Sequence, residues 1–289
     1  MTQITAALVK ELRERTGQGM MDCKKALEAA GGDIEKAIDD MRAAGAIKAA
    51  KKSGNIAAEG AVAIKQSGDG KAATIIEVNS QTDFLALQDD FKSFVAESLD
   101  IAAAKGYTDA EPLIAEREQA REELVAKTGE NVNIRRLKRV EGDVLGAYQH
   151  GNRIGAVVVL EGGDAELARD IAMHVAASNP QVVNPEEVSE ELVAKEKEIF
   201  LQLNEEKIKG KPENIVENMT KGRINKFLSE ISLVGQAFVK EPDVTVGKLA
   251  EKAGAKIVGF VRFEVGEGIE RKEEDFAAEV AAQVAASKK

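Results

Sequence analysis

The sequence is poor in aromatic residues and cysteine: of its 289 residues only 4% are aromatic, one is cysteine and none is tryptophan. The single cysteine, Cys23, excludes an internal disulfide framework and fits a reducing compartment. Few aromatics beside many alanines favour a helix-rich protein with modest cores over a β-sandwich. With 44% hydrophobic and 31% charged residues, the composition indicates a globular chain rather than a disordered one.

The sequence lacks both a targeting segment and an excess of positive charge. Its N-terminus has no basic-then-apolar signal pattern, and no apolar run approaches the ~20 residues that span a bilayer. We therefore expect a cytoplasmic protein without a membrane partner. The formal net charge of -10 argues against DNA and disfavours RNA, because phosphate binding needs clustered Lys and Arg. Two basic runs, at Lys48–Lys52 and Arg135–Arg139, are interpreted as solvated faces, with RNA contact as the alternative.

The motifs on which most catalytic sites are built are also missing. Gly68–Ala72 lacks the upstream glycine and the hydroxyl of a phosphate-binding loop, and neither a nucleophile elbow nor a zinc-binding spacing occurs. The two histidines, His150 and His174, stand alone. We interpret His174 and Cys23 as residues that pack on apolar helix faces. The sequence therefore predicts a protein that is not an enzyme and that needs no cofactor or metal.

The N-terminal part predicts a small three-helix bundle followed by a helical connector. Met20, Cys23 and Leu27 align on one face of the second helix. Asp33 is a good N-cap for the third helix, which follows the helical period closely. The Ala/Lys-rich stretch Ala43–Lys52 is expected to form the connector.

Beyond the connector the period of the apolar residues changes to two. Ala61–Lys65 and Thr74–Val78 flank Ser67–Gly70, which is typical of a β-hairpin, and an amphipathic helix follows. The same order recurs where Val144–His150 and Arg153–Leu160 enclose a tight turn. Hairpin-then-helix, twice, predicts an α+β core of two similar halves with antiparallel sheets.

The second half is interrupted by a charged helical insertion. Residues 185–231 carry an apolar stripe that includes Ile199 and Leu203, and Gly210–Pro212 breaks the helix, which predicts an antiparallel helical hairpin that projects from the core. The alternating segment Lys256–Phe263 is expected to complete the second sheet. A last amphipathic helix carries Phe276, Val280 and Val284.

The segment Asn79–Leu87 is unusual because it sets an acid beside a large aromatic, directly after a strand. Two interpretations are open. In the first, Phe84 enters the core while Thr82 or Asp83 caps a helical turn. In the second, Asp83 and Phe84 form a wedge that is presented to a pocket of a partner protein.

Five stretches, distributed in order over nearly the whole chain, resemble the bacterial elongation factor Ts family: Leu12–Leu27, Glu77–Phe84, Tyr148–Gly155, His174–Pro180 and Gly259–Gly268. The second of them contains the Thr-Asp-Phe motif at Thr82, Asp83 and Phe84. Ser80 stands where many members have Cys, and Leu85 where Val is usual. Both changes keep approximate size and polarity.

The resemblance implies a guanine-nucleotide exchange factor for elongation factor Tu, in its GDP-bound and nucleotide-free forms. In the family the Thr-Asp-Phe segment inserts beside the nucleotide site of the partner and dislocates Mg²⁺. That role falls here to Asp83 and Phe84, with Thr82 and Leu85 shaping the segment. The resemblance further implies contacts to the partner from the N-terminal bundle, the second half of the core and the C-terminal helix, which nominates Arg13, Met20, Met21 and His150.

The resemblance also implies a division of the chain: a ubiquitin-associated-like domain with its connector (1–54), a first core half (55–141), a second core half (142–184 and 232–265), a coiled-coil hairpin (185–231) and a C-terminal helical module (266–289). A homodimer and a 2:2 complex both stay open, as do the contacts of the hairpin. Without the resemblance, an adaptor for ubiquitin-like proteins or an RNA-binding adaptor would be the alternative function.

Overall fold

The computed structural model describes residues 4–270 and begins with a bundle of three helices, α1 (Ala6–Thr16), α2 (Met20–Ala29) and α3 (Ile34–Lys52). The side chain of Asp33 accepts a hydrogen bond from the Lys36 amide, so its predicted N-cap role is confirmed. Leu12, Cys23 and Leu27 are fully buried in the bundle, which also confirms Cys23 as a core residue.

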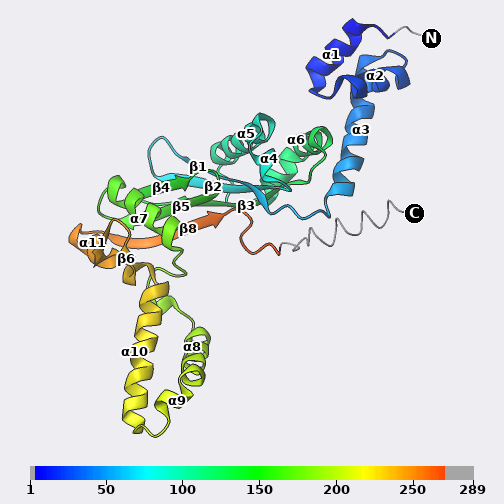
Figure 1. The fold of residues 1–289 in the computed structure, drawn as a ribbon. Coiled ribbons are helices and arrows are strands. Elements are labelled where there is room, and N and C mark those ends of the chain that lie inside the picture. The colour runs from blue at the N-terminus through cyan, green and yellow to red at the C-terminus, as the bar shows by residue number, and fades with distance from the viewer. Residues whose placement is uncertain (1–3, 271–289) are drawn as a thin grey trace, which may run out of the picture.

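The stretch Ala43–Lys52, predicted as a helical connector, is helical and forms the continuation of α3. Its C-terminal half packs against α6 (Glu111–Thr128) through small side chains. A Cβ added at Gly45 would lie 3.4 Å from the Cβ of Ala126, and Lys48 Nζ donates to the Ala126 carbonyl at 2.5 Å. Figure 1 shows that α3 carries the bundle away from the rest of the molecule.

The rest of the described chain is built on two antiparallel sheets of three strands and a small third sheet of two strands, so the predicted α+β class is confirmed. The first sheet contains β1 (Glu59–Gln66), β2 (Ala72–Ser80) and β3 (Val132–Glu141). The second contains β4 (Val144–His150), β5 (Ile154–Glu161) and β8 (Lys256–Glu264). As the alternation at Lys256–Phe263 predicts, β8 returns after the insertion and pairs with β5.

The two sheets face each other, and helices cover their outer faces (Figure 1). Strand β2 is buried throughout because both faces of its sheet are covered. Its side chains alternate between these faces, so Ile76 and Val78 face the helices, whereas Ile75 faces the second sheet. The outer helices of the first sheet are α4 (Asp83–Ala86), α5 (Asp89–Lys105) and α6.

The second sheet is covered by α7 (Ala165–Ser178), which lies very close to β4. A Cβ at Gly146 would lie 2.0 Å from the carbonyl carbon of Ala168, so only glycine permits this approach. The same core includes residues of η2 (Leu233–Gly235), β6 (Ala237–Phe238) and α11 (Val246–Lys252), and β7 (Glu241–Thr245) pairs with β6.

His174 on α7 packs in this second core, as the sequence indicates, and is 1% exposed. Its Nδ1 accepts a hydrogen bond from the Val239 amide at 3.2 Å, which leaves the proton on Nε2 to donate to Gln236 Oε1 at 2.9 Å. Burial lowers the pKa of His174, although the Gln236 contact opposes this effect in part. The side chain is therefore a neutral tether between α7 and the segment before β7.

The insertion contains η1 (Pro185–Glu187), α8 (Glu190–Leu203), α9 (Glu205–Ile208) and α10 (Glu213–Ile231). These helices project away from the sheets (Figure 1). The apolar stripe is less covered than the sequence predicts, since Ile199 is 39% exposed and Leu203 is 79% exposed. The coiled-coil character of the hairpin therefore stays a prediction. The amphipathic helix predicted around Phe276 lies outside the described residues.

Within residues 4–270, none of the helices combines the length and the apolar character that crossing a bilayer requires.

Candidate functional site

The segment that follows β2 forms α4, a single turn that presents Phe84 to solvent. Phe84 is 76% exposed and Asp83 is also exposed, whereas Leu85 is buried at 1% exposure. The interpretation in which Phe84 enters the core is therefore wrong, because Leu85 takes that place. The accompanying interpretation of Thr82 as a cap is confirmed, since its hydroxyl accepts a hydrogen bond from the Leu85 amide at 3.2 Å.

Two further features make this turn an unusual surface. Leu87, one position beyond α4, is 62% exposed, so two large apolar side chains lie three residues apart on one turn. Leu85 and Ala86, between them, point into the core of the first sheet. The inner side of the turn is thus held by the core, while its outer side exposes two large apolar side chains.

Thr82 is held in place by hydrogen bonds to Glu130, a residue that the sequence analysis did not identify. The Thr82 amide donates to Glu130 Oε2 at 3.0 Å, and the Thr82 hydroxyl lies 2.9 Å and 3.0 Å from the two carboxylate oxygens. Glu130 directly follows Gly129, whose positive φ of 76° ends α6. The contact joins residues 48 positions apart, so no local pattern could have identified it.

The neighbouring residue Asn131 fastens the same strand end. Its amide donates to Gln81 Oε1 at 2.7 Å, and its Nδ2 donates to the Asn55 carbonyl at 2.7 Å. Asn55 Nδ2 in turn donates to Gln81 Oε1 at 3.2 Å. The approach to α4 is therefore held by hydrogen bonds from both the α3–β1 connection and the end of α6.

The structure brings the turn that carries His150 to the same end of the core as α4. Glu59, the first residue of β1, pairs with Ser80 at the end of β2. Arg153, in the β4–β5 connection, donates from Nη1 to Glu59 Oε2 at 2.6 Å, and the Val62 amide donates to the Asn152 carbonyl at 2.8 Å. His150 itself is exposed.

The candidates on the N-terminal bundle lie elsewhere. Arg13 is exposed on α1, and Met20 and Met21 are 59% and 62% exposed at the start of α2. The alignment of Met20 with Cys23 and Leu27 as one buried face is therefore wrong, because the first turn of α2 extends beyond the bundle core. Figure 1 places the bundle well apart from α4.

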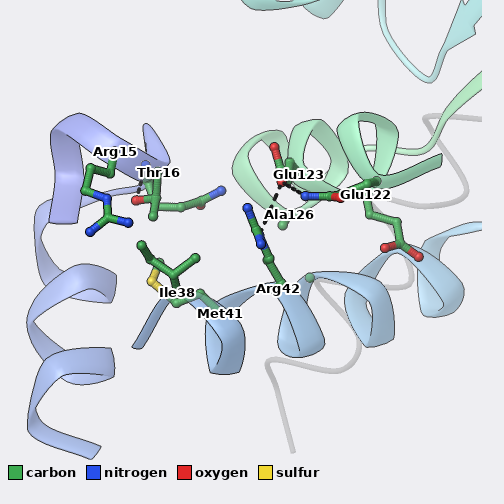
Figure 2. Close-up of a pocket in the computed structure, with 11 residues that line it drawn as sticks. Arg15, Thr16, Ile38, Met41, Arg42, Glu122, Glu123 and Ala126 are labelled. Atoms are coloured by element: carbon green, nitrogen blue, oxygen red, sulfur yellow. Dashed lines mark hydrogen bonds and ion pairs between the residues drawn. The ribbon is translucent and has the colours of Figure 1, made fainter. Parts of the chain in front are cut away.

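A crevice of about 130 Å³ lies between the bundle and α6 (Figure 2). Arg42 on α3 spans the crevice, and its Nε lies 3.8 Å from Glu123 Oε1 on α6. Thr16, which also lines the crevice, donates its hydroxyl hydrogen to the Leu12 carbonyl within α1. The described residues that line the crevice include no Cys, His or Ser. It separates two packed units and contains none of the candidate site residues.

The basic run at Arg135–Arg139 is only partly the solvated face that the sequence indicated: Lys138 is exposed, whereas Arg135 and Arg136 bind a buried carboxylate. Arg135 Nη1 and Arg136 Nε donate to opposite oxygens of the fully buried Glu77 carboxylate, at 3.1 Å and 2.5 Å. Two consecutive residues reach one side of the sheet because a β-bulge inserts Arg135 into β3, opposite the step between Glu77 and Val78.

The Glu77 carboxylate also accepts hydrogen bonds from the Gly266 amide at 2.8 Å and from Asn79 Nδ2 at 2.9 Å. Burial acts to raise the pKa of Glu77, but these hydrogen bonds and the charge of Arg136 outweigh it, so the pKa lies below the ordinary value. The network joins β2, β3 and the segment after β8, and it gives two of the basic residues a structural role.

Among the described residues, no group of three or more His, Cys, Asp or Glu side chains lies close enough to share a metal ion.

The fold and the site together define a class: an α+β protein whose most distinctive feature is a fastened, exposed aromatic turn at one end of a two-sheet core. A model of the family described as Elongation factor TS matches residues 81–267, a range that begins at this turn. Three proteins named Elongation factor Ts are similar to this chain over the full length of both chains. They come from Azotobacter vinelandii (77% identical), Stutzerimonas stutzeri (76%) and Pseudomonas aeruginosa (76%).

The chain therefore belongs to the elongation factor Ts family and is a translation elongation factor.

Proposed function

We propose that this protein is a guanine-nucleotide exchange factor that binds GDP-bound elongation factor Tu and promotes the release of GDP. The observation that carries the proposal is the exposure of Phe84 on a turn that is fastened on its inner side. Membership of the family supplies the partner, and the exposed aromatic turn supplies a means of acting on it. No covalent chemistry is required, so the protein acts without being an enzyme.

The physical basis of exchange is thermodynamic linkage. A nucleotide held with Mg²⁺ leaves slowly because the ion and the phosphate loop clamp its β-phosphate. A factor that binds the nucleotide-free partner more tightly than the loaded partner weakens nucleotide binding by the same ratio. A bias of ~4 kcal/mol changes the nucleotide affinity about a thousandfold.

Within the turn each residue has a separate task. Phe84, a rigid apolar wedge, displaces side chains that support the metal site of the partner. Asp83 perturbs the Mg²⁺ shell electrostatically or competes for hydrogen-bond donors. Capture of the ion by Asp83 is disfavoured, because Mg²⁺ demands nearly octahedral oxygen ligation. Thr82 and Leu85 shape the turn, the first as its cap and the second as its buried anchor.

The anchors that hold the wedge in place are proposed to lie on two other surfaces. Arg13, Met20 and Met21 are exposed on the N-terminal bundle, and the methionines offer adaptable apolar contacts. His150 is exposed at the same end of the core as α4, where it can touch the partner while the wedge is inserted. The C-terminal helical contact implied by the family lies outside the described residues.

The division of the chain into a ubiquitin-associated-like domain, two core halves, a coiled-coil hairpin and a C-terminal module belongs to the same proposal. The alternative, an adaptor that binds ubiquitin-like proteins or RNA, predicts no effect on a GTPase. The fixed positions of Arg135 and Arg136 in the Glu77 network favour the exchange factor over an RNA adaptor.

Isothermal titration of the full chain into elongation factor Tu tests the linkage. We expect the affinity for the nucleotide-free partner to exceed that for the Mg²⁺–GDP-loaded partner by about a thousandfold. A titration with GDP in the presence of excess chain is the reciprocal control and should show the same ratio. Equal affinities for the two forms of the partner would contradict the proposal.

A further inference from the structure

We propose that Glu130, which lies outside the Thr82–Leu85 turn, is a positioning residue for exchange: its carboxylate holds Thr82 and so fixes the direction in which α4 presents Phe84. The inference rests on the proposed function, in which Phe84 is the wedge. It adds a residue from a different part of the chain and a reason why the exposed turn is rigid.

Two atoms of Thr82 lie within hydrogen-bond distance of the Glu130 carboxylate. Glu130 accepts both the amide hydrogen and the hydroxyl hydrogen of Thr82, with donor–acceptor distances of 2.9–3.0 Å. A carboxylate is an acceptor only, so the hydroxyl must direct its single proton towards Glu130. Its lone pairs are then free to accept from the Leu85 amide, which is the capping hydrogen bond of α4. The carboxylate thus sets the rotamer on which the cap depends.

Helix α4 is too short to be stable without contacts to the rest of the chain. It has four residues, and a single helical turn is unfavourable in isolation because its hydrogen bonds do not repay the ordering of its backbone. Its shape therefore depends on the burial of Leu85 and Ala86 and on the fixation of its N-terminal end. Glu130 supplies that fixation together with Ser80, whose hydroxyl donates to the Thr82 carbonyl at 2.9 Å.

Glu130 is attached to the part of the core that packs against α3. It follows the C-terminal end of α6, the helix against which α3 packs. Lys48 on α3 donates to Ala126 on α6, three residues before Gly129. A continuous set of contacts therefore runs from the helix that carries the bundle, through the end of α6, to Thr82. When the bundle docks on the partner, Glu130 keeps the orientation of Phe84 fixed relative to that anchor.

A double-mutant cycle between Glu130→Ala and Phe84→Ala tests the inference, with the rate of fluorescent GDP release from elongation factor Tu measured over a range of chain concentrations. Loss of one charge-assisted contact predicts that Glu130→Ala lowers the maximal rate about tenfold while the half-saturating concentration changes less than about threefold. Added to Phe84→Ala, the same substitution should change the maximal rate less than about twofold, because it acts through the ring.

Two variants serve as controls. Glu130→Gln keeps the size of the side chain and one acceptor oxygen, so it should retain the fold and lower the maximal rate only about threefold. If Glu130→Ala fails to fold, the maximal rate measured with Glu130→Gln tests the role of Glu130 instead. Glu111→Ala removes the same charge from the exposed first turn of α6 and should leave the rate unchanged.

The outcomes separate the inference from the function on which it rests. Wild-type rates for Phe84→Ala would contradict both the proposed role of Phe84 as the wedge and the proposed role of Glu130. A slow Phe84→Ala beside wild-type rates for Glu130→Ala and Glu130→Gln would overturn only the role of Glu130. Full additivity of the two alanine substitutions would also overturn it, because it would show that Glu130 acts independently of Phe84.

Discussion

Replacing Phe84 by alanine should lower the maximal rate of GDP release that the protein induces by about a hundredfold, which corresponds to the loss of one hot-spot aromatic contact of ~3 kcal/mol. The ring is 76% exposed in the free chain, so its removal leaves no cavity, and the free energy of unfolding should change by less than about 0.5 kcal/mol. Rates measured by stopped flow at saturating chain, beside a thermal melt, check both statements.

The half-saturating concentration should change much less than the maximal rate, because Arg13, Met20, Met21 and His150 are proposed to supply most of the affinity. Val258→Ala is a matched control: Val258 is 49% exposed on β8, and its loss should leave the rate unchanged. Asp83→Asn should slow release less than Phe84→Ala does. Wild-type stimulation by Phe84→Ala would contradict the assignment of the ring as the wedge.

Replacing Glu77 by glutamine should lower the free energy of unfolding by about 3 kcal/mol at neutral pH, because it removes one partner from a buried ion pair. Glu77 is fully buried, and its carboxylate binds Arg135, Arg136 and the Gly266 amide. Denaturant titration followed by circular dichroism measures the change. Glu141→Gln is the matched control, because Glu141 pairs with Arg139 at 2.9 Å but is 69% exposed, and its loss should cost less than about 0.5 kcal/mol.

The effect of Glu77 should also depend on pH. Its pKa in the folded protein lies below the ordinary value of 4.5, so the unfolded state binds more protons as the pH falls below that value. The stabilisation is therefore complete above pH 4.5 and is lost as the pH falls through the pKa of the folded state. The stability difference between wild type and Glu77→Gln should therefore shrink progressively over the range below about pH 4.5. A difference that is constant over this range would contradict the account.

Much of the fold could be predicted because its signals are local. Asp33 as a cap and the hairpin around Ser67–Gly70 depend on residues close together in the chain. The return of Lys256–Phe263 to the second sheet followed from its alternation. The position of Met20 could not be predicted, since helical period alone does not reveal where the first turn of α2 leaves the bundle core.

The site was only partly predictable, for a physical reason. The sequence singled out Thr82–Leu85, but it left open whether Phe84 enters the core or is presented to a partner, because a single turn is too short to show a helical period. Glu130 was missed because its contact with Thr82 joins distant parts of the chain. The pairing of Arg135 and Arg136 with the buried Glu77 depends on a β-bulge, which shifts the alternation by one residue without a recognisable sequence pattern.

The central claim is that this protein accelerates the release of GDP from elongation factor Tu by presenting the Thr82–Leu85 turn to it. The most direct measurement is stopped-flow release of a fluorescent GDP from Mg²⁺-bound elongation factor Tu, with unlabelled GDP in excess and increasing amounts of the chain. The account predicts a rate that rises with chain concentration to a plateau at least about a hundredfold above spontaneous release. A release rate that stays at the spontaneous value at every chain concentration would contradict it.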